Sequence, residues 1–147
     1  MSTVYFVAFS FYQLNNVWSQ VGAGIVGTLP EPVAETDFLK KVKQTFEVGC
    51  VMHSCQTGRL IQKVALCGGS GAFLLPNAVR ANADVFITGE VKYHDYFFYE
   101  KDILIAAIGH YESEQYTKEI FYSILKEMFP RLTVEMTRVN TNPIKYL

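Results

Sequence analysis

The chain has 147 residues, half of them hydrophobic, which is enough for one domain with a hydrophobic core. Its net charge is −1 and its 13 basic residues are scattered, which excludes the basic face that nucleic-acid binding needs. No segment is long and apolar enough to span a bilayer, and the N-terminus lacks the basic start and cleavage site of a secretion signal. We therefore expect a cytoplasmic protein with neither a nucleic-acid nor a membrane partner.

Three cysteines, Cys50, Cys55 and Cys67, form an odd set without CxxC spacing. They predict reduced thiols rather than a disulfide framework or a zinc knuckle. Cys50 and Cys55 flank His53, so a metal site is one alternative there. The segment between them favours a strand, which would point alternate side chains to opposite faces. Small buried residues and a turn are therefore the preferred interpretation.

The first third of the chain predicts β structure followed by one helix. Residues 3–14 are rich in Val, Phe and Tyr, and residues 21–27 form a short apolar run bounded by glycines. Two prolines predict a linker over residues 29–33, because proline stops both helix and sheet pairing. Apolar side chains then recur at helical spacing over residues 35–46.

The remaining two thirds alternate between strands and helices. Strands are expected over 50–54, 61–67, 84–88, 103–108 and 132–138, and helices over 72–82, 93–100 and 113–128. This alternation is typical of an α/β fold, a layered sandwich with a mixed, largely parallel sheet.

Three polar loops each follow an apolar strand and open a helix: residues 67–71, 88–94 and 109–114. In parallel α/β sheets, functional loops gather at the carboxyl ends of the strands. The three loops are therefore expected to share one edge of the sheet. Together they favour a functional site at this edge more strongly than any one of them does alone.

The first loop, Gly68, Gly69, Ser70 and Gly71, lets backbone N–H groups approach an anion such as a phosphate. It matches neither G-x-G-x-x-G nor a P-loop. A tight turn from strand to helix without a ligand explains it equally well.

The second loop offers Glu90, Lys92 and His94. The carboxylate and the imidazole could act as general base and acid, and the lysine could hold a phosphate. The alternative is a polar loop with a helix N-cap and a hydrogen-bonded histidine.

The third loop places His110 and Glu114 four residues apart at the entry to a helix, so both side chains can point the same way. Imidazole and carboxylate together suit zinc, manganese or iron. Two ligands cannot complete a site, and others must come from elsewhere. Glu112 and Ser113 are expected to serve the helix N-terminus. Alternatively, His110 ends the strand and Glu114 is a first-turn acid, and spacing alone leaves both interpretations open.

Taken together, the three loops resemble the family named for NGG-interacting factor three (the Nif-three family), whose bacterial members are often labelled GTP cyclohydrolase I type 2 homologues. The likeness covers about residues 11–125. The matching stretches are residues 64–71, 83–95 and 109–114, with 22–32 resembling the return from the family's inserted domain.

The resemblance implies an α/β domain assembled from both halves of a longer chain, and toroidal hexamers with dinuclear metal sites. It implies that His110 and Glu114 are metal ligands, and that Lys92, Tyr93 and His94 line the site. Glu90 departs from the family, which usually has aspartate at that position.

The family's other ligands, a His-His pair and a later His and Asp, belong to an N-terminal half that this chain does not match. Residues 1–30 are then the end of the inserted domain and a linker behind a new start, and residues 31–147 are the C-terminal half of the α/β domain. The resemblance therefore implies at most a weak or single-metal site, completed by a neighbouring subunit or solvent. It also implies self-association, as a trimer or hexamer, over the apolar surface that the missing half would cover.

Three functions follow as hypotheses. The first is a metal-dependent hydrolase for a small phosphorylated or nucleotide-like ligand, with Lys92 and residues 68–71 holding a phosphate and His94 transferring protons. The second is a noncatalytic binding or oligomeric assembly module built on residues 93–99 and 113–128. The third is a structural remnant without a function of its own.

Overall fold

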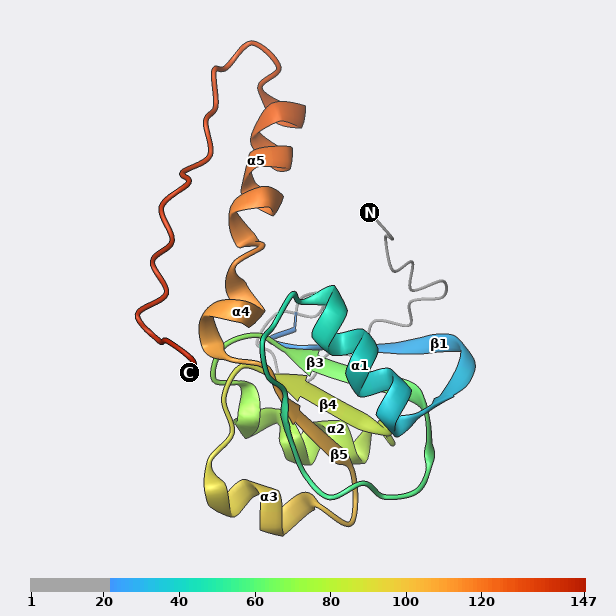
Figure 1. Cartoon of the computed structure of the whole chain (residues 1–147). Helices are drawn as coiled ribbons and strands as arrows, with labels where there is room; N and C mark the ends of the chain where they lie inside the picture. The colour runs from blue at the N-terminus through green and yellow to red at the C-terminus, as the bar shows by residue number, and fades with distance from the viewer. Residues whose placement is uncertain (1–21) are drawn as a thin grey trace.

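The computed structural model describes residues 22–147, so the strand expected over residues 3–14 lies outside the described residues. Figure 1 shows a sheet with helices on both faces and a C-terminal arm that extends away from it. The elements in chain order are β1 Ile25–Ala34, α1 Glu35–Thr45, β2 Met52–His53, β3 Leu60–Cys67, η1 Gly71–Leu74, α2 Leu75–Arg80, β4 Val85–Thr88, α3 Tyr93–Tyr99, β5 Leu104–Ala107, α4 His110–Glu114 and α5 Thr117–Met128.

The five strands form one mixed sheet in the order β1-β3-β4-β5-β2. The central strands β3, β4 and β5 are parallel, whereas the edge strands β1 and β2 each pair antiparallel with their neighbour. All four residues of β4 and of β5 are buried, which is the pattern of central strands covered on both faces. The predicted α/β fold with a mixed sheet is confirmed.

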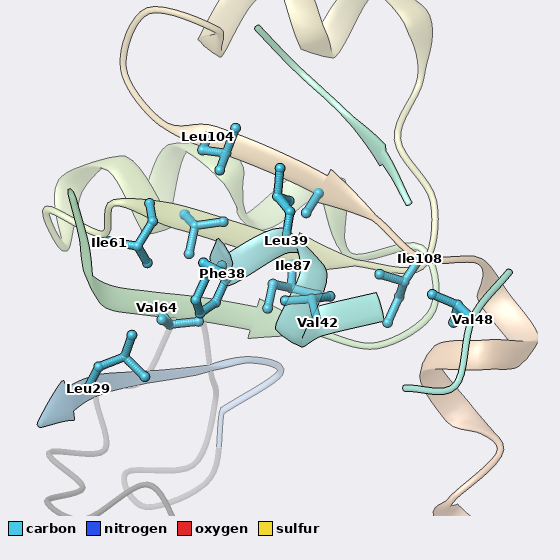
Figure 2. Packing of buried hydrophobic residues seen from close by; sticks show 12 residues of the cluster. Leu29, Phe38, Leu39, Val42, Val48, Ile61, Val64, Ile87, Leu104 and Ile108 are labelled. Carbon is cyan, nitrogen blue, oxygen red and sulfur yellow. The ribbon is translucent and has the colours of Figure 1, made fainter. Parts of the chain in front are cut away.

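One face of the sheet is covered by α1, whose Phe38, Leu39 and Val42 pack against strand residues that include Val64 and Ile87 (Figure 2). The opposite face is covered by η1, α2 and α3. A second cluster of buried residues lies there, built from Val26, Ala65, Cys67, Leu74, Leu75, Ala78, Ala83, Phe86, Ile103 and Ile105. Burying apolar surface on both faces supplies most of the drive for folding and fixes the strand ends in place.

The prediction of a linker over residues 29–33 was wrong, because this segment lies inside β1. The register of β1 against β3 shifts between Thr28 and Val33, and both prolines fall in this interval. Proline is compatible with an edge strand at a bulge, where its missing N–H removes no bond from the ladder.

The helix predicted over residues 113–128 is two helices, α4 and α5, separated by a turn at residues 115–116. At this turn the Thr117 hydroxyl donates to the Glu114 carbonyl at 2.7 Å, which gives that carbonyl a side-chain partner in place of a continuing helix. None of the residues of α5 is buried.

The strand predicted over residues 132–138 was also wrong, since this segment has no strand pairing. It belongs to an extended tail, residues 129–147, that runs back beside α5 toward α4 (Figure 1). β propensity alone does not make a strand without a neighbouring strand to pair with. Within residues 22–147, no helix is both long and apolar enough to cross a membrane.

Candidate metal centre

The three predicted loops meet at the carboxyl ends of β3, β4 and β5. The Gly89 amide donates to the Gly69 carbonyl at 2.9 Å, and the Gly109 amide donates to the Gly89 carbonyl at 3.0 Å. Because these bonds are between backbone groups, they hold the loops in fixed register at one edge of the sheet. The expectation that the loops share an edge is confirmed.

His110 lies between two carboxylates at this edge. Its Nε2 is 3.3 Å from Glu114 Oε2, and its Nδ1 is 3.0 Å from Glu90 Oε1. The imidazole is 43% exposed, and the two carboxylates are 54% and 53% exposed. The group is therefore open to an ion or a ligand, and its charges stay partly solvated.

Glu90 is held from two sides. Ser70 Oγ donates to Glu90 Oε2 at 2.5 Å, while Oε1 faces His110. The hydrogen bond from Ser70, followed by the one from His110, lowers the pKa of Glu90 below its ordinary value. In the tautomer with its proton on Nδ1, His110 would donate a hydrogen bond to Glu90 and present Nε2 to the Glu114 side.

Gly69 forms the floor of the centre. Its φ is +62°, and a Cβ on it would lie 2.5 Å from Glu114 Oε1 and 3.4 Å from His110 Nε2. An alanine would therefore be strained by its backbone and would occupy the space beside both side chains. Glycine is therefore required at position 69, because only a residue without a Cβ lets the backbone lie so close to the Glu114 and His110 side chains.

Ser113 ties the first loop to the third. Its hydroxyl donates to the His110 carbonyl at 2.8 Å and accepts from the Gly69 amide at 2.9 Å. The expectation that Ser113 serves the helix N-terminus was incomplete, because α4 already begins at His110. Sequence reasoning missed this bridge, since the local pattern of the third loop contains no signal for its contact with Gly69.

The anion role predicted for residues 68–71 stays a prediction. The Gly69 amide donates to Ser113 and the Gly71 amide donates to Thr88 Oγ1 at 3.0 Å, so these two N–H groups are engaged within the protein. Ser70, in contrast, lines a cleft of about 700 Å³ together with Glu90 and Lys92. Lys92, the predicted phosphate-binding residue, thus lines the same cleft as Glu90 of the candidate centre.

Lys92, Tyr93 and His94 lie at the start of α3. The Lys92 amide donates to Asp95 Oδ2 at 3.3 Å, which caps the helix. The rings of Tyr93 and His94 are exposed and meet edge to face with centroids 5.5 Å apart. Among the described residues, neither ring lines the cleft beside Lys92 or the one beside His110. Their predicted roles remain predictions.

The cysteine prediction was correct in part. All three cysteines are free, and Cys67 is buried, but Cys50 and Cys55 are exposed rather than buried. They flank the two-residue edge strand β2, whose residues are themselves exposed. Over residues 22–147, no three His, Cys, Asp or Glu side chains are grouped so that they could hold a metal ion.

The donor set at the sheet edge fits a divalent metal ion in type but not in number. Nε2 of His110 and Oε2 of Glu114 are close enough to contact one ion, and Glu90 is placed to orient the imidazole. Two protein ligands leave the remaining coordination positions to water, to a ligand or to another chain.

This fold and this arrangement of loops define a class of α/β proteins with a candidate metal centre at the strand ends. The model of the Duf34/NIF3 (NGG1p interacting factor 3) family matches residues 4–143, and the chain belongs to this family. It is 31% identical over 143 residues to a "GTP cyclohydrolase 1 type 2 homolog" of Staphylococcus epidermidis RP62A. That match covers 94% of this chain and 38% of the relative.

Two solved structures are similar to the chain. Staphylococcus aureus protein SA1388 matches with a TM-score of 0.75 at 25% identity, over 86% of this chain and 42% of that one. A Bacillus cereus protein related to NIF3 matches with a TM-score of 0.69 at 22% identity, over 84% and 36%, and supports the fold alone. The chain thus spans well under half the length of these relatives.

Proposed function

We propose that this chain binds one divalent metal ion, zinc, manganese or iron, through His110 Nε2 and Glu114. The single observation that carries the proposal is the row of three side chains Glu90–His110–Glu114, with contacts of 3.0 Å and 3.3 Å. A metal-binding histidine commonly donates its other ring N–H to a carboxylate, and Glu90 is in that position.

The proposed reaction class is metal-dependent hydrolysis of a small phosphorylated or nucleotide-like molecule. When bound, a divalent ion at this edge would polarise the bond to be cleaved and activate water. Lys92 is placed to attract an anionic group, because it lines the neighbouring cleft with Ser70 and Glu90. His94 is the candidate for proton transfer, because its imidazole is the acid–base group of the second loop.

The name of the staphylococcal relative supports this class without fixing the substrate. The staphylococcal relative is called a GTP cyclohydrolase 1 type 2 homolog, and this chain corresponds to 38% of it. Further ligands must come from water, a bound molecule or another chain, and a neighbouring subunit in a trimer or hexamer is the proposed source.

A noncatalytic assembly module is the second candidate, and α5 is the observation that favours it. Ile120, Phe121, Ile124 and Met128 recur at helical spacing and are 44–65% exposed. Apolar side chains repeated along one exposed helix are suited to contact with a partner surface. This candidate accounts for α5 without requiring turnover at the metal centre.

The test is the metal content of the purified protein, measured by inductively coupled plasma mass spectrometry before and after incubation with zinc or manganese. We expect near-stoichiometric metal in the wild type and none in His110→Ala. His53→Ala is the matched control, because His53 is exposed on the edge strand β2 and does not line the cleft at the candidate centre. An empty wild type, or equal metal in both variants, would contradict the proposal.

If the wild type binds metal, the two candidate functions separate by activity. Hydrolysis of phosphoester and nucleotide probes that disappears in His110→Ala supports the hydrolase. Metal binding without turnover, together with a sedimentation coefficient that falls when Phe121 is replaced by Ser, supports the assembly module.

A further inference from the structure

The candidate metal centre opens into a cleft that has one wall on the sheet edge and the other on the C-terminal tail. Its volume is about 500 Å³. The inner wall is formed by Glu90, His110 and Glu114, with Lys118 of α5 beside them. The outer wall is formed by tail residues Thr137, Val139, Thr141, Asn142, Pro143 and Ile144.

The tail is attached to the centre at one buried point. Asn142 Nδ2 donates to Glu112 Oε1 at 2.9 Å, and Glu112 is 9% exposed. Glu112 Oε2 is buried, and the Tyr146 hydroxyl lies against the same carboxylate. Hydrogen bonds to a buried carboxylate are among the stronger contacts a side chain can make.

The position of Glu112 connects this attachment to the metal centre. Glu112 lies in α4, two residues from each of the candidate ligands His110 and Glu114. The Tyr146 hydroxyl lies near the same carboxylate. Both groups would be close to a Cβ placed on Gly109, which shows that they share this space. The tail therefore meets the helix that carries the ligands, and it does so at the ligand-bearing turn.

The tail is otherwise held by local bonds. The Asn142 amide donates to Asn140 Oδ1 at 2.8 Å, and the Ile144 amide donates to Asn142 Oδ1 at 3.0 Å. These bonds shape a turn within residues 140–144, and Lys126 Nζ of α5 donates to the Leu132 carbonyl at 3.2 Å outside this turn. Removal of the Asn142 side chain would therefore weaken the attachment of the tail to Glu112, where the Tyr146 hydroxyl also lies, and leave the buried core of the sheet unchanged.

We propose that residues 137–146 form a strap that covers the metal centre and that the Glu112–Asn142 contact is its latch. The strap controls exchange between the centre and solvent, so opening the latch speeds the loss of a bound ion. This inference rests on the proposed metal function, and it adds a gate that the ligand residues alone do not provide.

The test compares wild type, Asn142→Ala and Gln44→Ala in two measurements. Limited digestion with trypsin, followed by mass spectrometry, gives the cleavage rates after Arg138 and Lys145 in the strap. Cleavage after Arg131, outside the strap, is the internal reference. Zinc-loaded protein is then mixed with excess EDTA, and the rate of zinc loss is followed.

We expect Asn142→Ala to raise strap cleavage and the rate of zinc loss by about tenfold each, the effect of one lost hydrogen bond to a charged group. Gln44→Ala, which removes an exposed side-chain amide from α1, should change each rate less than about twofold. Cleavage after Arg131 should be the same in all three proteins.

Unchanged strap cleavage in Asn142→Ala would overturn the latch. Faster cleavage with an unchanged rate of zinc loss would overturn the gate. A wild type that takes up no zinc before EDTA is added would instead contradict the metal site itself, so the two failures are distinguishable.

Discussion

The sheet edge and the C-terminal arm, α5 with residues 129–147, both contribute walls to the same cleft, but they are stabilised differently. The sheet edge rests on strands whose side chains are fully buried, whereas no residue of α5 is buried. The loops at the edge are joined by backbone hydrogen bonds, and the arm reaches them through side chains such as Asn142. The candidate ligands therefore have a rigid support in the sheet, whereas the C-terminal arm, which we propose controls access to them, is held by fewer and weaker contacts.

The largest expected effect separates the two regions by burial. Phe86 is 0% exposed in β4, and its replacement by Ala should lower the free energy of unfolding by about 3–5 kcal/mol. Phe121 is 61% exposed in α5, and Phe121→Ala should change it by no more than about 0.5 kcal/mol. Urea unfolding followed by circular dichroism measures both. Losses of similar size, dependent on protein concentration, would show that the arm packs against another subunit.

The next effect concerns the glycines of the sheet edge. Gly69→Ala should lower the free energy of unfolding by about 2 kcal/mol, because it combines a positive φ with the close contact to Glu114. It should also weaken zinc binding at least about tenfold, since Glu114 must move. Gly58 has φ +76° but open space around it, so Gly58→Ala should cost about 1 kcal/mol and leave zinc binding unchanged. Equal zinc affinity in the two variants would show that Gly69 does not shape the centre.

A third effect is a pH dependence in the body of the domain, away from the arm. Glu35 is buried, and it accepts hydrogen bonds from the Thr57 hydroxyl at 2.7 Å, the Thr57 amide at 2.9 Å and the Gly58 amide at 3.1 Å. Burial raises the pKa of Glu35, but these hydrogen bonds and the charge of Arg59 outweigh it and lower the pKa overall.

Because the folded pKa of Glu35 is lowered, its contribution is present above the ordinary glutamate pKa of about 4.3 and is lost as pH falls through the folded value. Glu35→Gln should therefore lower the free energy of unfolding by about 1–2 kcal/mol at pH 7, with the difference shrinking between about pH 5 and pH 3. Urea unfolding over this range measures it. A difference that stays constant with pH would contradict the assignment.

The smallest effect is expected on the exposed surface of α1. Lys40 Nζ lies 3.2 Å from Asp37 Oδ1, and both side chains are about two-thirds exposed. Lys40→Ala should change the free energy of unfolding by less than about 0.5 kcal/mol. A loss of free energy of unfolding larger than this would contradict the expectation that an exposed ion pair contributes little to stability.

Local rules predicted the sheet edge well. The loops ending at residues 71, 94 and 114 follow apolar strands, and parallel strands place such loops together. The spacing of His110 and Glu114 on one helical turn predicted that their side chains point the same way, and they lie 3.3 Å apart. Glu90 was identified as a polar candidate, but its bond to His110 depends on where β4 and β5 lie relative to each other, which no local pattern contains.

The elements that the sequence did not predict depend on distant contacts. The prolines of residues 29–33 predicted a linker. They are compatible with a strand only because β1 is an edge strand with a bulge, and its pairing with β3 is a distant contact. The strand expected over 132–138 had β propensity but no neighbouring strand to pair with. The attachment of Asn142 to Glu112 joins residues 30 apart, so neither side chain alone signals a shared role.

In the proposed centre, Glu90 orients His110 so that Nε2 and Glu114 can bind one ion. Calorimetric titration of wild type and Glu90→Gln with zinc tests it most directly. We expect measurable binding in the wild type and an affinity about 10- to 100-fold lower in the variant, as for other carboxylates that hold a metal-binding histidine. Equal affinities, or no binding by the wild type, would contradict it.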